Sequence, residues 1–274
     1  MSIVLDHLTF GYDRTPVFED VSLTLDPGIV HLILGPTGCG KTTLALLMVG
    51  LLRPTGGGVL VDGKDPAGAG FPRHLIQLAF QFPEVQMFEL TVDREIAYGL
   101  RNLGLEDAEI QARSSWALEC VGLAAHWLGR DPHNMSFGER RKVALASVIA
   151  MKPAYLLLDE PLAGLDWQGR KSLATTIEGL KRQGITVIVL THEADLIGEV
   201  GDTMLSVAGT GISAPRPAAG FLYRRPRPAA GEIPEHIRLL HLMAAGAFDV
   251  PCQPYRLADT AAAIKQALKS NRLL

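Results

Sequence analysis

Hydrophobic and polar positions along the chain follow two different periods. Stretches in which apolar residues alternate with polar ones, or run on continuously, predict strands at residues 3–12, 21–25, 29–34, 59–62, 154–158, 186–191 and 202–207. Interrupted apolar stripes with helical spacing predict a helix from residue 41 and further helices at residues 95–103, 108–121, 139–150 and 168–183. A polar turn at residues 13–16 and a glycine-rich loop at residues 56–58 separate the early strands.

The later elements indicate an α/β domain with a parallel sheet. A strand at 154–158, a helix at 168–183 and a strand at 186–191 follow one another, which is the pattern of a βαβ crossover between parallel strands. Helical spacing dominates between residues 91 and 150, so we expect a helical subdomain inserted within this domain. The domain as a whole is expected to span residues 1–207.

The composition changes after this domain. Residues 208–234 are rich in Ala, Pro, Gly and Arg and contain the hexapeptide Pro-Arg-Pro-Ala-Ala-Gly twice, which is typical of a semi-extended linker. Beyond it, residues 235–245 and 259–269 are predicted to form two amphipathic helices. Residues 235–274 are therefore expected to form a small helical extension.

Composition and charge argue against several classes of protein. The chain has 274 residues and a formal net charge of −3, and its dense basic runs, residues 140–142 and 223–227, are interpreted as solvated faces, so duplex nucleic acid is not expected as the main partner. The longest apolar run, residues 44–52, is shorter than the roughly 18 to 20 residues that cross a bilayer, and no leader pattern is seen. The spacing of cysteines and histidines predicts a cytosolic protein without a metal site built from protein ligands alone.

One short segment carries a phosphate-binding motif. Residues 35–43 match the pattern G-x-x-x-x-G-K-[ST] and stand between a predicted strand and a predicted helix. Such a loop directs backbone N–H groups and a helix N-terminus at phosphate oxygens, while the lysine neutralises the outer phosphates and the next hydroxyl ligates Mg²⁺. The nucleotide-binding candidates are Gly35, Pro36, Thr37, Gly38, Cys39, Gly40, Lys41, Thr42 and Thr43, with Thr42 also a Mg²⁺ ligand.

Polar residues follow three more predicted strands. Asp159 is expected to hold Mg²⁺, and the adjacent Glu160 to act as the general base that polarises the attacking water. His192 follows the next strand, and because the carboxyl ends of parallel strands line one crevice, we expect it to contact the γ-phosphate there. Gln81 follows another apolar strand end, from which its amide oxygen can reach Mg²⁺ and water.

Two aromatic features of the first part of the chain are less specific. Tyr12 stands at the end of the first predicted strand, where either its ring stacks on an adenine base or the aromatic pair Phe10 and Tyr12 belongs to the core. The loop after Gln81 contains proline and aromatic residues and can contact another protein.

Taken together, these residues resemble the nucleotide-binding subunit of ATP-binding cassette (ABC) transporters, from residue 3 to about residue 207. The matching pieces are Tyr12, the phosphate loop, Gln81, the turn Ser136–Glu139, Asp159, Glu160, the loop Pro161–Asp166 and His192. The stretch Gln81-Phe-Pro-Glu84 with Gln86, Phe88, Thr91 and Val92 is similar, more particularly, to the ATPases of energy-coupling factor importers, which take up vitamins or cobalt and nickel.

The resemblance implies a fold and a mechanism. The fold would be a P-loop NTPase of the ABC type, with a RecA-like core, an antiparallel β subdomain and a helical subdomain. ATP and Mg²⁺ would bind in a head-to-tail dimer, each ATP lying between the phosphate loop of one subunit and Ser136, Gly138 and Glu139 of the other, while Asp166 couples the two sites. The second ATPase subunit would be a copy of this chain or a related chain.

The resemblance also implies partners and a location. Closure of the dimer on two ATP molecules would drive transmembrane transporter subunits at the inner face of the cell membrane, and hydrolysis would reset the dimer. The loop after Gln81 is the expected contact with those subunits. Carboxy-terminal helices after the cassette help to pair two ATPase subunits in this group, which suggests the same role for residues 235–274.

The turn departs from the Ser-Gly-Gly-Gln of the family at two positions. Phe137 replaces the first glycine, and its Cβ is expected to exclude backbone angles that only glycine tolerates. Glu139 replaces the glutamine and adds a negative charge near phosphate. We therefore expect a turn that is functional but altered.

Alternative functions are an ATPase of another transporter class and an ABC ATPase outside transport. A chromosome-maintenance or DNA-repair ATPase would insert long coiled coils, yet residues 43–154 contain no sustained heptad pattern. A ribosome-associated translation factor would need two cassettes, and one phosphate loop is present. A purely regulatory nucleotide-binding module is disfavoured by Glu160 and His192, which are suited to hydrolysis.

Overall fold

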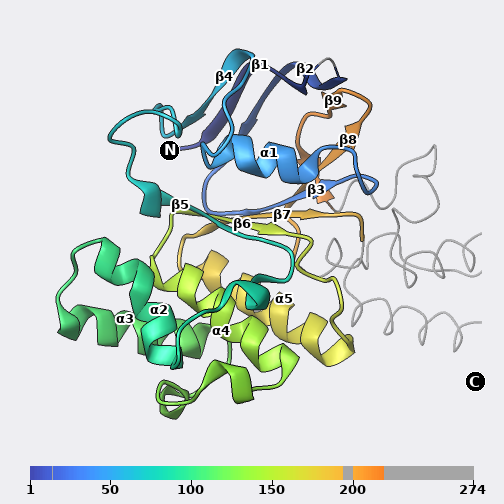
Figure 1. The fold of residues 1–274 in the computed structure, drawn as a ribbon. Coiled ribbons are helices and arrows are strands. Elements are labelled where there is room, and N and C mark those ends of the chain that lie inside the picture. Colours follow the sequence, from blue (N-terminus) through green and yellow to red (C-terminus); the bar gives the residue numbers. More distant parts are fainter. Residues whose placement is uncertain (14, 194–199, 219–274) are drawn as a thin grey trace, which may run out of the picture.

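The computed structural model describes residues 1–13, 15–193 and 200–218 (Figure 1). These residues form two sheets with helices packed between and below them. The predicted carboxy-terminal helices, the basic run at 223–227 and most of the predicted linker lie outside the described residues.

The smaller sheet is antiparallel, has the order β2-β1-β4 and consists of β1 (Ile3–Tyr12), β2 (Thr15–Leu25) and β4 (Gly56–Val61). The predicted turn at 13–16 is too long, because Thr15 already pairs with Tyr12. Asp13 has φ +51° and supplies the left-handed residue that a two-residue hairpin turn needs. An antiparallel subdomain is present, as expected.

The glycine run at residues 56–58 belongs to strand β4, so the prediction of a loop there is wrong. Gly57 has φ +65°, and a Cβ at this position would come within 2.1 Å of the carbonyl oxygen of His7 in β1. Glycine thus allows β4 to approach β1 where the register of the two strands shifts. Sequence rules that treat consecutive glycines as a loop do not include this close approach.

The larger sheet has the order β10-β8-β3-β7-β6-β5, and β9 pairs with β8 beside it. Its strands are β3 (Val30–Leu34), β5 (Ile76–Ala79), β6 (Tyr155–Asp159), β7 (Thr186–Thr191), β8 (Thr203–Ala208), β9 (Gly211–Ile212) and β10 (Arg216–Pro217). The strands from β8 to β5 are parallel to one another. The predicted α/β fold class is confirmed, and the strands predicted at 154–158 and 202–207 are each displaced by one residue.

Strands β9 and β10 lie where the sequence predicts the start of the linker. Both pair antiparallel with β8, and the N–H of Ala218 donates to the carbonyl of Asp202 over 2.9 Å. Residues 211–217 therefore extend the sheet rather than leaving it at residue 208. The proline and alanine content that indicated a linker is compatible with short strands at the edge of a sheet.

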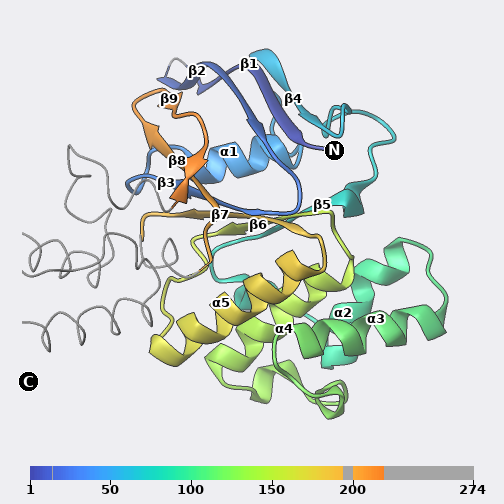
Figure 2. The ribbon, with the colours of Figure 1, turned by 180° about the vertical axis from the view of Figure 1, so that it is seen from behind.

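Helices cover the two faces of the larger sheet. They are α1 (Lys41–Met48), α2 (Val92–Asn102), α3 (Asp107–Cys120), α4 (Phe137–Ala150) and α5 (Trp167–Arg182), with single 3₁₀ turns η1 (Arg73–Leu75), η2 (Pro83–Gln86), η3 (Ala125–Trp127) and η4 (Pro132–Asn134). Figures 1 and 2 show α1 between the two sheets and α2 to α5 on the opposite face of the larger sheet. Within the described residues, the helices are too short or too polar to span a membrane.

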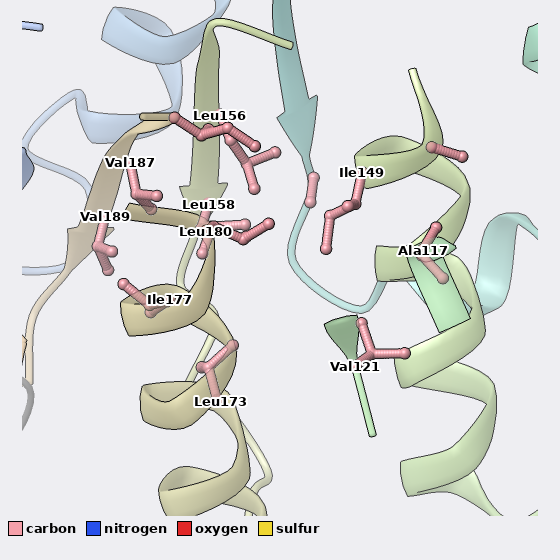
Figure 3. Packing of buried hydrophobic residues seen from close by; sticks show 14 of the residues in the cluster. Ala117, Val121, Ile149, Leu156, Leu158, Leu173, Ile177, Leu180, Val187 and Val189 are labelled. Carbon is pink, nitrogen blue, oxygen red and sulfur yellow. The ribbon is translucent and has the colours of Figure 1, made fainter. Parts of the chain in front are cut away.

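Alternation along the strands builds two hydrophobic cores. Leu156 and Leu158 of β6 point to the α4 and α5 side, where they pack with Ile177 and Leu180 (Figure 3). Leu157, between them, points to the opposite side and joins α1 and the antiparallel sheet. Because both faces are buried, the strands read as continuous apolar runs, which is why their positions could be predicted.

One buried histidine makes the stability of this fold depend on pH. His31 of β3 is 1% exposed; its Nε2 lies 2.8 Å from the carbonyl oxygen of Asp26 and its Nδ1 lies 2.6 Å from Oγ1 of Thr203. A neutral ring satisfies both contacts, with Nε2 donating and Nδ1 accepting. Burial lowers the pKa of His31, although the nearby Asp26 and Asp202 oppose that shift.

We expect stability to fall as the pH drops below about 6.5, because the unfolded state then binds a proton that folded His31 does not accept. The loss approaches about 1.4 kcal/mol per pH unit for this one group. A His31→Gln variant should lose less stability on acidification than the wild type, whereas a change at exposed His126, His126→Gln, should keep the wild-type slope. Urea unfolding between pH 5 and about pH 8 measures both slopes; equal slopes for wild type and His31→Gln would contradict the assignment.

Candidate nucleotide-binding and hydrolysis site

The phosphate loop joins β3 to α1. Gly40, which precedes α1, has φ +101°, and a Cβ there would come within 2.6 Å of Cγ1 of Val17 in β2, so this position requires glycine for two reasons. Lys41 is only 5% exposed, and its Nζ donates to the carbonyls of Gly35 (2.8 Å) and Pro36 (3.1 Å). The ammonium group is thus held inside the loop that surrounds it.

Main-chain hydrogen bonds align the strand ends that carry the other candidates. The N–H of Gly35 donates to the carbonyl of Thr191 at the end of β7 (3.3 Å), and the N–H of Glu160 after β6 donates to the carbonyl of Leu190 (2.7 Å). The phosphate loop, the acidic pair and His192 therefore leave the same edge of the sheet from neighbouring strands.

Asp159 presents a carboxylate suited to a divalent cation. It is 4% exposed; its Oδ2 accepts a hydrogen bond from Oγ1 of Thr42 (2.6 Å), and its Oδ1 is buried without a hydrogen-bond partner among the described residues. Burial raises the pKa of Asp159, and the charge of Glu160 adds to the rise. Since Mg²⁺ prefers oxygen ligands and is commonly held by one or two carboxylates with phosphates, the unpaired oxygen beside the Thr42 hydroxyl fits this ion.

Glu160 contacts two other candidates, Lys41 and His192. Lys41 Nζ lies 3.1 Å from its Oε1, and Nδ1 of His192 lies 3.0 Å from its Oε2. Burial works against ionisation of Glu160, but the hydrogen bonds and charges of His192 and Lys41 outweigh it and lower the pKa. The backbone of Glu160 is held at φ +46°, a strained angle for a residue with a side chain.

The two adjacent acids thus differ in the direction of their pKa shifts. The pKa of Asp159 is raised and that of Glu160 is lowered. Neighbouring carboxylates whose surroundings push their pKa values apart are a common arrangement where two acids have different roles. The structure brings His192 to Glu160, and its predicted contact with a γ-phosphate stays a prediction.

Tyr12 lies beside the phosphate loop with its ring open to solvent. The side chain is 49% exposed, and its hydroxyl is 3.4 Å from Oγ1 of Thr43. Phe10 is buried and meets the Tyr12 ring edge to face, with 5.0 Å between ring centroids. Core packing therefore describes Phe10, whereas Tyr12 keeps a free ring surface for which adenine stacking remains the prediction.

Gln81 follows β5, the strand next to β6. Ala79 pairs with Leu158, so Gln81 begins its loop at the sheet edge where Asp159 lies. Its side chain is exposed. The strand order explains how it comes near the site, and its predicted contact with Mg²⁺ stays a prediction.

The Ser136 turn caps α4. The N–H and the Oγ of Ser136 both donate to Oε2 of Glu139, over 2.8 and 2.7 Å, and the N–H of Glu139 lies 3.4 Å from Oγ of Ser136. This reciprocal arrangement is a capping box. The hydrogen bonds from Ser136 lower the pKa of Glu139, which is therefore ionised at neutral pH.

Phe137 does not need the backbone of a glycine. It is the first residue of α4 and is not among the residues with positive φ, so the expectation that its Cβ meets glycine-only angles is wrong. The capping box sets ordinary helical geometry directly after Ser136. The Phe137 side chain is 42% exposed instead of being packed away.

Asp166 has the same capping role for α5. Its Oδ1 accepts a hydrogen bond from the N–H of Gly169 over 2.8 Å. Asp166 and the Ser136 turn line a common cavity of about 310 Å³, whose wall also includes Asp159. The first turns of α4 and α5 thus face the same cavity as Asp159 at the end of β6.

Arg141 was missed by the sequence analysis, which placed residues 140–142 on a solvated face. It is 8% exposed, and its guanidinium donates to the carbonyls of Pro161 (2.7 Å) and Ala163 (2.5 Å). Arg141 thereby ties α4 to the loop after Glu160. Its position three residues before the apolar Ala144, on the inward stripe of α4, was the available signal.

Comparison with known proteins decides the family. The profile described as "ABC transporter" matches residues 18–163, more than half of the chain. The chain belongs to the ABC transporter family. The matched residues include the phosphate loop, Gln81, the Ser136 turn, Asp159 and Glu160, and the predicted family is confirmed. Tyr12, Asp166 and His192, which also supported the prediction, lie outside the matched residues.

Several relatives of this ABC chain are named as transporter ATPases of the energy-coupling factor or cbiO type. It is 43% identical over 214 residues to an energy-coupling factor transporter ATP-binding protein, EcfA2, of Symbiobacterium thermophilum, covering 75% of this chain and 74% of that protein. A protein with the same name from Clostridium acetobutylicum is 36% identical over 213 residues, with 74% of each chain covered. The solved structure of cbiO1 from Clostridium perfringens, described as part of the ABC transporter complex cbiONQ, superimposes with a TM-score of 0.75 at 29% identity, covering 88% of this chain and 98% of that one.

These likenesses establish the class of activity. This ABC chain binds and hydrolyses ATP, and it resembles the energy-coupling factor and cobalt-type ATPases, as the sequence predicts. The individual site residues carry their predicted roles as proposals.

Loss of the Arg141 guanidinium should destabilise this ABC ATPase. In Arg141→Met the carbonyls of Pro161 and Ala163 lose their donors, and the buried Glu84 nearby loses a neighbouring positive charge. We expect the free energy of unfolding to fall by about 3 kcal/mol, because buried groups lose charged partners. Urea unfolding measures the change, with exposed Arg101→Met as the control. Equal stabilities of the two variants would contradict the role given to Arg141.

Proposed function

We propose that this chain is the ATPase subunit of an importer of the energy-coupling factor type, which moves a vitamin or a transition metal ion such as cobalt or nickel through membrane subunits. The names of its relatives support the importer type. The observation that carries the hydrolytic part is the contact of one carboxylate, Glu160, with both Lys41 and His192.

In this proposal ATP binds at the phosphate loop with its adenine on the Tyr12 ring. Lys41 then exchanges the Glu160 carboxylate for phosphate oxygens, which leaves Glu160 free to act as a base. Thr42, Asp159 and Gln81 would hold Mg²⁺, and the ion when bound would supply charge neutralisation at the phosphates. The carboxylate partner that Lys41 loses is thus replaced by the phosphates of the substrate.

Glu160 is suited to accept the proton of the attacking water because it is ionised and partly buried. His192 donates a hydrogen bond to Glu160 through its main-chain N–H (3.3 Å) and contacts it through Nδ1. These contacts fix the direction of the carboxylate. The rest of the His192 ring is exposed, and it is proposed to meet the γ-phosphate.

Two ATPase subunits are proposed to pair head to tail, each completing the nucleotide site of the other with its Ser136 turn and Asp166. Closure on two ATP molecules would drive the membrane subunits, and hydrolysis would reopen the dimer. The pair would work at the cytoplasmic face of the membrane.

The membrane subunits are proposed to dock beside η2 and α2. Four large apolar side chains are exposed there, at 37% to 67% of their surface: Phe82, Phe88, Leu90 and Tyr98. Phe88 and Tyr98 stack edge to face with their centroids 4.9 Å apart. An exposed apolar group of this size in the loop after Gln81 is a common feature of protein contacts.

A Glu160→Gln variant should bind ATP, dimerise and turn over at least about 100-fold more slowly, because a general base contributes roughly 10² to 10⁴ to the rate. Phosphate release and ATP-dependent size-exclusion chromatography measure the two properties. Glu119→Gln, which changes an exposed carboxylate of α3, should match the wild type in both. Undiminished hydrolysis in Glu160→Gln would remove the base assignment.

Detergent extracts of the source membrane should yield this chain bound to a membrane protein. Replacing both Phe88 and Tyr98 with Ser should lower the recovery of that protein several-fold, since their apolar surface would no longer be buried against it. Leu51→Ser, which removes an apolar side chain 63% exposed after α1, serves as the control and should recover it fully. If the chain is recovered only as a free dimer, the importer proposal is wrong.

A further inference from the structure

The donors of the Ser136 turn are already used within this chain. A γ-phosphate from a second subunit would need the hydroxyl of Ser136 and the N–H groups at the start of α4. Here a single oxygen, Oε2 of Glu139, accepts both the N–H and the Oγ–H of Ser136, over 2.8 and 2.7 Å. Hydrogen bonds to a carboxylate are shorter and stronger than those to a neutral amide.

Glu139 also places a negative charge where the phosphate would lie. The hydrogen bonds from Ser136 lower the pKa of Glu139, with smaller contributions from the charges of Arg130 and Lys142. The carboxylate stands in the first turn of α4, so it is stabilised by the positive end of the same helix that would attract a phosphate. The Glu139 carboxylate and the γ-phosphate would therefore compete for the N-terminus of α4, and the carboxylate belongs to the helix itself.

The ring of Phe137 adds a steric feature to the same turn. It is 42% exposed at the first position of α4, directly after the serine. Gly138 next to it remains open: a Cβ built there would meet no atom within 4 Å. Gly138 therefore leaves open space between an exposed aromatic ring and an ionised carboxylate.

We propose that Glu139 holds the Ser136 turn of this chain closed, so that a composite site that uses this turn binds ATP and hydrolyses it slowly. A neutral residue at position 139 would free the Ser136 donors for the γ-phosphate. This inference rests on the proposed head-to-tail dimer.

The test is a gain of activity in the full-length chain purified alone, where a dimer has the Ser136 turn in both sites. Glu139→Gln keeps the length and one acceptor but removes the charge, and we expect it to raise the ATPase rate at saturating Mg-ATP about tenfold, equivalent to roughly 1.4 kcal/mol. The double variant Phe137→Gly/Glu139→Gln should raise it further. Glu106→Gln, the same chemical change at the N-cap of α3, should leave the rate unchanged.

Two more measurements separate a local effect from a structural one. Adding Ser136→Ala to Glu139→Gln should abolish the gain, because the freed hydroxyl carries it. In the Glu160→Gln background, Glu139→Gln should lower the protein concentration at which ATP produces the dimer, as measured by sedimentation velocity. A misfolded variant would not show tighter ATP-dependent pairing.

The proposal is overturned if neither Glu139→Gln nor the double variant hydrolyses ATP faster than the wild type. This holds whether the wild-type rate is high or low. A gain that survives Ser136→Ala, or one that Glu106→Gln reproduces, would overturn it as well. Failure of the wild-type chain to bind ATP in calorimetry would instead contradict the proposed function. The two failures are therefore distinguishable.

Discussion

Parallel pairing of β3, β7 and β6 is the constraint on which the site depends. Residues from three distant parts of the chain meet because these strands end at the same level, held by the main-chain bonds from Gly35 to Thr191 and from Glu160 to Leu190. The side-chain contacts of Lys41 and His192 with Glu160 then follow from positions that the sheet has already set. A shift of one strand by a residue would reverse the faces of its side chains and break the contacts that its own residues make in the site.

Two carboxylates near the site, those of Glu160 and Glu139, have partners within the chain, and the two arrangements differ in their consequences. Lys41 holds a carboxylate from another loop, which a phosphate can displace while Lys41 keeps an anionic partner. Ser136 holds a carboxylate from its own helix turn, three residues away, which cannot leave. The first arrangement suits the proposed phosphate site, whereas the second stabilises the start of α4 and underlies the proposed weakness of the Ser136 turn.

The sequence predicted the elements whose signal is long and local. Buried parallel strands such as 186–191 and the periodic helices were placed to within a few residues, and the phosphate motif identified the loop and its lysine. Three local details were not predicted, because each depends on a contact with a distant segment or on capping geometry. Gly57 is in a strand because β1 passes close by, Phe137 adopts helical angles because Ser136 and Glu139 cap the helix, and Arg141 is buried because two carbonyls receive it.

The sequence predicted which residues belong to the candidate site, but it did not predict which of them contact one another. Motif spacing indicated Lys41, Asp159, Glu160 and His192, but spacing carries no information on which of these side chains touch one another. The ion pair of Lys41 with Glu160 and the opposite pKa shifts of the two acids needed coordinates. The same holds for the closed Ser136 turn, since a glutamate at that position is compatible with a side chain that faces outward.

The contact between Gly40 and Val17 limits how this family member can vary. The antiparallel sheet meets the phosphate loop at this point, since a Cβ added at Gly40 would come within 2.6 Å of Cγ1 of Val17. Position 40 is restricted twice, by its backbone angle and by Val17. The effects of substitutions at positions 17 and 40 should therefore be non-additive, which couples a strand of the antiparallel sheet to the phosphate loop.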